Sequence, residues 1–553
     1  MIKTLIICIF SLYLIHAPQP RATKKYDVVI YGGTSAGVAA AIQSSRMGKT
    51  VVLIEPTQRI GGLTTGGLGA TDIGNKNAIG GISREFYQNI RKYYDDPGHW
   101  KWQPRSEYPA SQTARTAENE DAMWTFEPSA ALQVLQAMIG SERVDLVYGE
   151  HLDRRNGVKK VGQAIQKIAM ESGAAYEGKI FIDASYEGDL MAAAGVSYTV
   201  GREDNTQYGE SIDGFYLARY RQPSGFHQFP DGVDPYKTPG VPESGLLWGI
   251  GPDSVQPAGK GDKKIQAYNF RICLTDNADN MIPITRPQDY DSSRYELLKR
   301  LFAAQPGLRS ISDYFIWTPM PNRKTDINNR GAFSTDMIGA NYNWPDATAG
   351  QRKKIFDAHV SYTKGLLYFM QTDPGVPGNL RKYMSSWGYP KDEYIQDDHF
   401  TPQLYIREAR RMIGEYVMTE HNCRGTDTVK DAIGLAAYTM DSHNCQRIIV
   451  NGMVKNEGNV EVGGFPPYPI SYRSIIPKST ECTNLLVPAA LSASHIAFGS
   501  IRMEPVFMVL GQSAAIAASI AIDNTQAVQE VDYEKLKEAL LKNKQRIAVP
   551  AHP

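Results

Sequence analysis

The chain has 553 residues, of which 42% are hydrophobic and 21% charged, as in an ordinary globular protein. Lysine plus arginine and aspartate plus glutamate number 59 each, so the sequence lacks the basic excess that nucleic-acid binding requires. It contains no internal repeat and no long low-complexity tract. The length allows about two to four domains, or one elaborate two-domain enzyme.

The first 22 residues have the pattern of a secretory signal peptide. Lys3 precedes an apolar run, Leu5–Ile15, and a region of small and polar residues follows it. The run is too short to span a bilayer, and no twin arginine precedes it. We therefore expect residues 1–22 to be a cleaved Sec-type leader. The mature protein would be periplasmic or extracellular, without stable membrane insertion.

The cysteines and histidines predict no metal site. No C-x-x-C pair and no Cys/His spacing of metal-ligand type occurs. Outside the leader the cysteines are few and scattered, so we expect buried or singly paired thiols, although an exported protein could pair them in three ways. They are Cys273, Cys423, Cys445 and Cys482.

Residues 26–55 follow the order strand, glycine turn, helix, strand and acid. The apolar run 26–31 predicts a buried parallel strand, 38–48 a small-residue helix, and 50–54 a second strand that ends at Glu55. A tight turn brings backbone N–H groups and a helix N-terminus to a pyrophosphate, and the acid accepts hydrogen bonds from a ribose. This order predicts a dinucleotide site made of Gly32, Gly33, Thr34, Ser35, Ala36, Gly37 and Glu55.

Thr34 stands where the G-x-G-x-x-G pattern has its middle glycine. A threonine is compatible with the turn if its backbone dihedrals are ordinary and its hydroxyl points away from the phosphates. A second glycine-rich segment, 59–69, follows Glu55 directly. Because glycine permits close backbone approach, we expect Gly61 and Gly62 to contact the ligand; a flexible surface loop is the alternative.

The remaining pattern predicts a regular α/β region interrupted by a different one. Residues 201–399 are rich in proline, aspartate, asparagine and aromatic residues, and we expect them to form a second, inserted domain. The expected helices are 82–94, 128–139, 351–370 and 505–522. The expected strands are 144–148, 163–168, 179–183 and 484–487.

Several separated segments together resemble one protein family. They are the glycine-rich stretch 28–69, the strand and turn 181–190 with Asp183-Ala184-Ser185-Tyr186-Glu187-Gly188-Asp189, the segment 405–411, and the closing segment 472–514 with Arg502-Met503-Glu504-Pro505 and Gly511-Gln512. They resemble a family of FAD-dependent oxidoreductases, secreted bacterial flavoproteins of which some carry a xanthan-lyase label. The resemblance covers about residues 26–200 and 400–522.

The resemblance implies an α/β fold with a discontinuous Rossmann-like FAD-binding domain, 26–200 and 400–522, in three layers around a central parallel sheet. An inserted α+β substrate or cap domain would comprise 201–399, and 523–553 would be a C-terminal tail. FAD would extend from the glycine turn and Glu55 along the Gly61-Gly62 loop. Further cofactor contacts implied by the resemblance are Asp183, Ala184, Ser185, Gly511 and Gln512.

Hydride transfer from an alcohol or amine also needs a base for the accompanying proton. His495 is the preferred candidate and His443 the second, with a structural histidine as the alternative for each. Arg502 could add positive charge at the flavin N1–C2=O edge; an ion pair with Glu504 or another acid is the alternative. Arg407, Arg410 and Arg411 read as a salt-bridged helix face rather than a substrate clamp.

The leading hypothesis is an exported FAD-dependent oxidoreductase that transfers a hydride between flavin and a small organic substrate, with carbohydrate-derived compounds among the candidates. Tryptophans in the loop-rich segments suggest a sugar pocket but also fit a core. They are Trp100, Trp102, Trp124, Trp317, Trp344 and Trp387. The alternatives are a carbohydrate-active lyase or hydrolase and a glycan-binding protein on a flavoprotein scaffold. The sequence does not indicate the electron acceptor.

Overall fold

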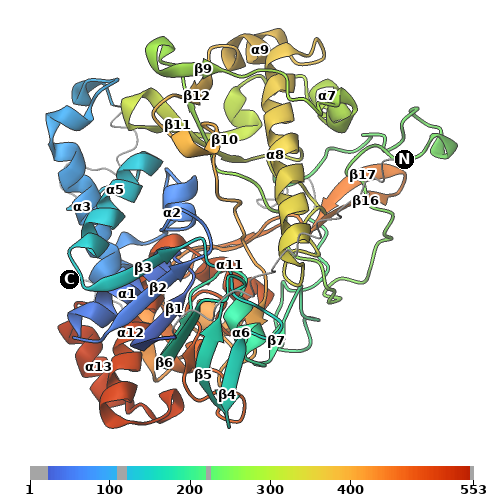
Figure 1. The fold of residues 1–553 in the computed structure, drawn as a ribbon. Helices are drawn as coiled ribbons and strands as arrows, with labels where there is room; N and C mark the ends of the chain where they lie inside the picture. Colours follow the sequence, from blue (N-terminus) through green and yellow to red (C-terminus); the bar gives the residue numbers. More distant parts are fainter. Residues whose placement is uncertain (1–22, 109–120, 219–225, 549–553) are drawn as a thin grey trace, which may run out of the picture.

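The computed structural model describes residues 23–108, 121–218 and 226–548. The predicted signal peptide, 1–22, lies outside these residues. A seven-stranded sheet forms the centre of the lower half of the molecule (Figure 1). Its order is β3 (Val144–Tyr148), β2 (Val51–Glu55), β1 (Lys24–Tyr31), β6 (Ala175–Asp183), β5 (Ala164–Ala169) and β4 (Val158–Val161), and β20 (Leu485–Leu486) also pairs with β6.

The sheet is parallel where the glycine turn lies and antiparallel beyond it. Strands β3, β2, β1, β6 and β20 run parallel, whereas β5 and β4 continue from β6 as an antiparallel meander. Residues 28–31 and all of β2 are buried on both faces, as parallel strands covered by helices are. The strands and helices of this region confirm the predicted α/β fold.

Two helices pack tightly against each other beside the parallel strands. They are α1 (Ser35–Arg46) and α12 (Glu504–Asn524). A Cβ atom at Gly511 would collide with the carbonyl oxygen of Ala36, so glycine allows the two backbones to touch. Among the described residues, α12 alone is long and apolar enough to cross a membrane, but 89% of its most apolar window is buried inside the protein. Further helices of this half are α2 (Leu63–Gly66), α3 (Gly81–Asp95), α5 (Pro128–Gly140), α6 (Asp189–Ala193), α11 (His495–Ile501) and α13 (Tyr533–Lys542).

A second sheet lies in the upper half of Figure 1 and is antiparallel throughout. Its order is β10 (Phe315–Met320), β11 (Lys324–Asn329), β8 (Ile272–Thr275), β12 (Gly388–Pro390) and β9 (Met281–Pro283). Helices α7 (Glu296–Ala304), α8 (Ala349–Thr372) and α9 (Gly378–Met384) accompany it, and α8 extends from this sheet toward the first (Figure 1). All these elements lie within the range 201–399.

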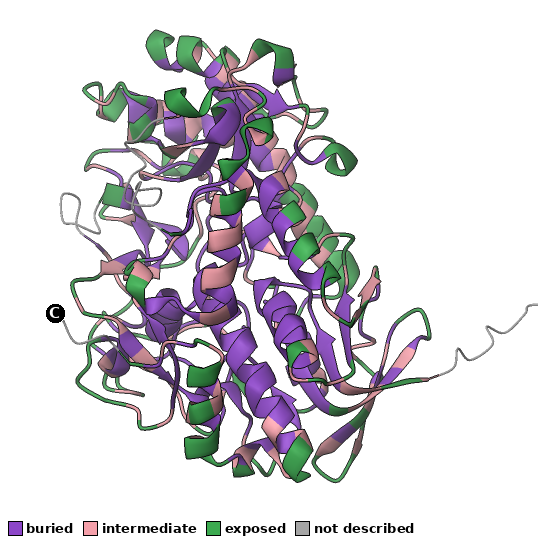
Figure 2. Cartoon of the chain, turned by 90° about the vertical axis from the view of Figure 1, so that its left-hand side faces the viewer, coloured by how far each residue is buried: buried purple, intermediate pink, exposed green. Residues whose placement is uncertain are grey.

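Further strands form short two-stranded pairs. They are β7 (Tyr198–Thr199) with β13 (Arg411–Met412), β14 (Ala432–Ala436) with β19 (Tyr468–Ser471), β15 (Met440–Ser442) with β18 (Val460–Val462), and β16 (Gln446–Val450) with β17 (Met453–Glu457); α10 (Glu420–Cys423) lies between β13 and β14 in the chain. One cluster of buried hydrophobic residues includes members of both sheets, and Figure 2 shows buried segments in both halves.

The structure differs from two expectations about local conformation. Residues 405–410 are buried and not helical, so the predicted helix is wrong, whereas the predicted ion pairs of Arg407, Arg410 and Arg411 are present. The range 523–553, predicted as a tail, contains α13, whose Leu536 and Leu540 are buried against the body. The four cysteines are buried and unpaired.

Candidate active site

The glycine turn joins β1 to α1 and has the backbone that the motif requires. Gly32 has φ +98°, and a Cβ atom there would lie 2.6 Å from the backbone nitrogen of Ser185. A side chain would therefore be strained and would also collide with the segment after β6. Glycine at position 32 therefore allows the turn to pack directly against Asp183-Ala184-Ser185.

Thr34, the departure from the motif, is the N-cap of α1. Its φ and ψ of −62° and 176° are ordinary extended values. Its hydroxyl donates to the carbonyl oxygen of Ala184 at 2.7 Å and accepts from the backbone N–H of Gly37. The hydroxyl therefore serves the protein's own turn, and threonine there satisfies one of the free N–H groups at the helix start.

Glu55 ends β2 with its carboxylate turned toward the glycine turn. One oxygen accepts from the N–H of Gly33 at 2.7 Å and the other from the N–H of Thr57 at 2.7 Å. Burial raises the pKa of this carboxyl group, which is only 6% exposed. A Cβ atom at Gly33 would lie 2.8 Å from the carboxylate, so glycine is what allows the two to meet.

Asp183 is the last residue of β6, Ala184 and Ser185 follow it, and each of the three has a different role. Asp183 accepts from the N–H and hydroxyl of Ser185 and from the N–H of Met191, so it shapes the turn that leads into α6. Burial raises the pKa of Asp183 to about 6. The carbonyl of Ala184 receives Thr34, and Ser185 lines a cavity.

A cavity of about 270 Å³ lies over the glycine turn and is lined by Gly32, Thr34, Glu55, Ser185 and Tyr186. It adjoins a cleft of about 900 Å³, with which it shares Arg59, Gly62 and other residues. A glycine-walled cavity with a carboxylate at the end of the second strand fits the ribose and pyrophosphate of a dinucleotide. Of the six tryptophans singled out from the sequence, Trp344 lines both spaces, whereas Trp124 is a fully buried core residue.

The loop after Glu55 is fixed by a buried hydrogen-bond network. The Tyr186 hydroxyl accepts from the N–H of Leu63 at 2.9 Å and donates to Glu504 at 2.7 Å. The other oxygen of Glu504 accepts from the hydroxyl of Thr64 at 2.7 Å. Burial raises the pKa of Glu504, the first residue of α12. This network links the Gly62 end of the cavity to the start of the closing helix.

The structure places Gly511 and Gln512 away from this cavity. Gly511 lies at the contact of α12 with α1. The side chain of Gln512 bonds to Ile82, Gln43 and Asn543, and it lines a different, polar pocket. The closing motif thus packs helices together in this chain.

His495, the preferred base, is fully enclosed at the start of α11. Its Nδ1 lies 2.7 Å from Glu408, its Nε2 lies 2.8 Å from the hydroxyl of Ser442, and the residue is 1% exposed. The three side chains have the spacing of a Ser-His-Glu triad. Ser442 is also 1% exposed, so this serine is not presented to a substrate.

His443 lies where the two halves meet and has a charged partner on each side. Its Nδ1 is 2.7 Å from Asp336, and its Nε2 is 3.6 Å from Asp441. Burial and Arg407 act to lower the pKa of His443, but the two aspartates outweigh them and raise it above its usual value. Its side chain is 11% exposed, compared with 1% for that of His495.

Two arginines complete this network. Arg407 pairs with Asp336 at 3.0 Å, and Arg502 pairs with Asp441 at 3.0 Å. Both guanidinium groups lie over the ring of Tyr405, whose hydroxyl accepts from Arg502 at 2.8 Å. The Nε of each arginine is buried without a hydrogen-bond partner. Arg502 therefore forms an ion pair with an acid, as the alternative interpretation expected, and that acid is Asp441 rather than Glu504.

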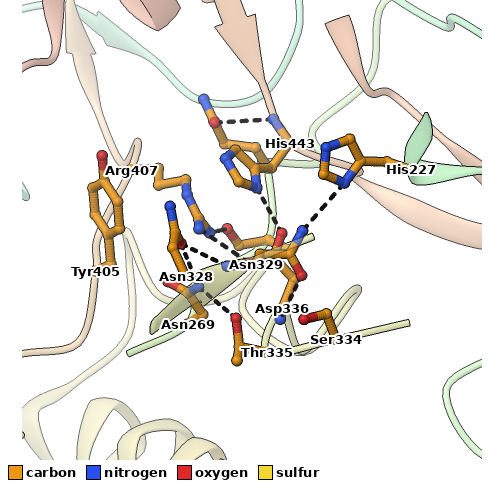
Figure 3. A network of polar contacts seen from close by, with 12 residues as sticks. His227, Asn269, Asn328, Asn329, Ser334, Thr335, Asp336, Tyr405, Arg407 and His443 are labelled. Carbon is orange, nitrogen blue, oxygen red and sulfur yellow. Dashed lines mark hydrogen bonds and ion pairs between the residues drawn. The ribbon is translucent and has the colours of Figure 1, made fainter. Parts of the chain in front are cut away.

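The second half supplies the opposite wall of the network. Figure 3 shows His443 and Arg407 converging on Asp336, with Asn329 beside it. The amide of Asn329 meets His227, which pairs with Glu461 at 3.0 Å. Below them, Asn269 donates to Asn328 and Thr335.

Sequence reasoning found His443, Arg407 and Arg502 but missed their partners. Asp336 lies in a loop without periodicity, so nothing local marked it. Asp441 was readable, because alternation along β15 puts Asp441 and His443 on one face and Ser442 on the other. No group of three or more His, Cys, Asp or Glu side chains within the described ranges is arranged to hold a metal ion.

Comparisons with known proteins identify the family of the chain. A family model described as FAD dependent oxidoreductase matches residues 27–540. No curated protein matches the chain.

Several solved structures of flavoenzymes are similar to parts of the chain, at low identity and low TM-score. A flavin monooxygenase mutant from Stenotrophomonas maltophilia is 14% identical over 29% of this chain and 38% of its own, with a TM-score of 0.19. The L-amino acid deaminase from Proteus vulgaris is 15% identical over 34% and 54%, with a TM-score of 0.22. The thioredoxin reductase of T. acidophilum is 16% identical over 29% and 35%, with a TM-score of 0.17. The match thus spans from about a third to about half of the length of these proteins. Because the family model covers nearly all of the 553-residue chain, the chain belongs to the FAD-dependent oxidoreductases and uses FAD as its cofactor.

Proposed function

We propose that this oxidoreductase transfers a hydride between FAD and a small, polar organic substrate bound beside His443. The observation that carries the proposal is the Asp336–His443 pair, 2.7 Å apart, at the junction of the two halves. A carboxylate on Nδ1 fixes the ring and its tautomer, so that Nε2 is the atom presented to a substrate. Its nearest charged neighbour, Asp441, is 3.6 Å away, beyond close hydrogen-bonding distance.

The pocket residues would hold the cofactor and His443 would handle the proton. Glu55 would accept hydrogen bonds from the ribose, and the glycine turn and Ser185 would face the pyrophosphate. Bound FAD supplies a two-electron acceptor or donor of hydride. In the oxidising direction, neutral His443 takes the hydroxyl or amine proton at Nε2; in the reducing direction, the imidazolium returns a proton from that atom.

The charges around His443 favour an uncharged polar substrate. Each arginine is already paired with an aspartate, Arg407 with Asp336 and Arg502 with Asp441. The charges of the two arginines and the two aspartates balance each other. Such a site offers many donors and acceptors without an ionic field, which suits a sugar or another polyol.

Carbohydrate chemistry also agrees with export, which we propose from the N-terminal leader pattern. An exported enzyme meets extracellular carbohydrate. Export as an unfolded chain implies that FAD is acquired after translocation.

Anaerobic reduction of the FAD-loaded protein tests this proposal. Sugars, polyols, hydroxy acids and amines are mixed with it, and the flavin absorbance near ~450 nm is followed. We expect bleaching by a sugar or polyol, and a rate at least about a hundredfold lower in His443→Asn. Bleaching by none of the panel, in protein shown to contain FAD, contradicts hydride transfer from these substrates. Cleavage of a glycan without bleaching would favour the lyase or hydrolase alternative.

A further inference from the structure

One wall of the cavity over the glycine turn comes from the other half of the chain. Its floor is made by residues between Tyr31 and Asp189, but Trp344 and three residues of α8 (Ala349, Arg352 and Phe356) also line it. Trp344, Arg352 and Phe356 line the adjoining cleft as well. The first turns of α8 therefore lie between the two spaces.

A bidentate ion pair between Arg352 and Asp189 joins this part of α8 to the Rossmann-like half. Arg352 bonds Asp189 through both terminal nitrogens, at 2.6 and 2.9 Å. Its remaining donors reach the carbonyl oxygens of Trp344 at 3.0 Å and Pro345 at 2.8 Å. The fork geometry makes this a directional contact that lysine cannot reproduce.

The pair is sheltered from solvent and belongs to the segment that builds the cofactor cavity. The side chains of Arg352 and Asp189 are 13% and 8% exposed. Burial acts to raise the pKa of Asp189, but Arg352, Arg154 and Arg410 outweigh burial and lower this pKa to about 2. Asp189 opens α6, six residues after the end of β6, and itself lines the cavity. Salt therefore screens this pair weakly.

We propose that the FAD site extends across both halves, with Trp344, Arg352 and Phe356 as cofactor-binding residues and the Arg352–Asp189 pair as the contact that retains FAD. A ligand enclosed between the turn and α8 leaves only when α8 separates from Asp189. The proposal goes beyond hydride transfer and requires only that the chain binds FAD, so it stands whatever the substrate is.

The rate of FAD release tests the proposal without a substrate. Arg352→Gln leaves Asp189 paired with Arg410 at 2.9 Å and with Arg154 at 3.4 Å, so the buried carboxylate keeps partners and the fold is retained. After dilution of the holoprotein, recovery of free-flavin fluorescence is followed. We expect release at least about tenfold faster in Arg352→Gln, because truncating a sheltered charge pair acts mainly on dissociation.

Lys364→Gln is the matched control. It removes an ion pair of the same helix, with Asp398 at 3.3 Å, and Lys364 lines neither the cavity nor the cleft. We expect wild-type release from this variant. Equal release rates in wild type, Arg352→Gln and Lys364→Gln would overturn the proposal.

Amide hydrogen exchange gives a second measurement on the unmodified chain, which remains decisive if the Arg352→Gln variant does not fold. FAD added to the apoprotein should slow exchange in residues 349–356 as well as in the glycine turn. Protection of the turn alone would show that α8 takes no part in binding FAD.

Discussion

The hydroxyl of Ser442 lies 2.8 Å from Nε2 of His495, on the face of β15 opposite to Asp441 and His443. His495 in turn contacts Glu408 at 2.7 Å, and Glu408 is the neighbour of Arg407 in the chain. Gln266 adds a further link, because it donates to Glu408 and accepts from the N–H of His443. His495 therefore links the segment that carries Arg407 and Glu408 to β15, on the face of β15 opposite to His443.

Removing the Ser442 hydroxyl should loosen this support without touching the site itself. In Ser442→Ala we expect the pKa of His443 to fall toward its ordinary value, because β15 no longer holds His443 and Asp441 in register. Histidine-selective NMR titration measures the pKa, with His443→Asn for assignment. Ser513→Ala, a buried serine that bonds Ile433 instead, is the control. An unchanged His443 titration in Ser442→Ala would exclude the link.

Asp336→Asn should change the pH dependence of both stability and reduction. The pKa of His443 is raised in the folded protein, so its contribution to stability is present below the ordinary histidine pKa and is lost as pH rises through the raised value. The variant should therefore lose most stability at low pH. Urea unfolding between about pH 5 and 8 measures this. In the oxidising direction, the pH midpoint of the reduction rate should move down.

The control for this variant is Asp346→Asn, which removes an aspartate that pairs with Arg410 at 2.9 Å and is 65% exposed. It should leave both profiles unchanged. A stability difference between wild type and Asp336→Asn that grows with rising pH would contradict the assignment.

Thr34→Ala should weaken the start of α1. It removes the N-cap and the bond to the carbonyl of Ala184, and such caps contribute about 1 kcal/mol to the free energy of unfolding. Thr34→Ser keeps the hydroxyl and should behave like wild type. Urea unfolding of the FAD-free protein compares the three. Equal stability of the alanine and serine variants would show that the cap contributes nothing.

Glu55→Gln should weaken FAD binding by about tenfold or more. The carboxylate accepts hydrogen bonds from the N–H groups of Gly33 and Thr57, whereas the single oxygen of an amide can replace only one of its two oxygens. Titration of apoprotein with FAD, followed by flavin fluorescence, gives the dissociation constant. Glu171→Gln alters an exposed acid at the same cavity and should leave it unchanged. Identical affinity in Glu55→Gln and wild type would exclude the ribose contact.

The parts of this fold that follow local rules were predictable. The glycine turn, β1, β2 and Glu55 lie within one unit of about 30 residues. The helices α8 and α12 could be predicted from the length and composition of their segments. The condition placed on Thr34, ordinary dihedrals with the hydroxyl turned to the protein, is met because the residue is also a helix cap.

The network around His443 was predictable only in part, because distant segments build it. Successive members of the series His227, Asp336, Arg407 and His443 are 109, 71 and 36 residues apart in the chain, and only tertiary contacts join them. The segment 405–411 was misread as a helix because its three arginines suggested a salt-bridged helix face. In the structure these arginines are buried and do form ion pairs, Arg407 with Asp336, Arg410 with Asp189 and Arg411 with Glu203, but the partners come from distant segments.

The rate of anaerobic flavin reduction in His443→Asn tests the central claim most directly. The variant is loaded with FAD, its flavin absorbance is confirmed, and it is mixed with the substrate that bleaches wild type fastest. The account predicts full FAD content and a reduction rate lower by at least about a hundredfold. Reduction of FAD-loaded His443→Asn at the wild-type rate would contradict it.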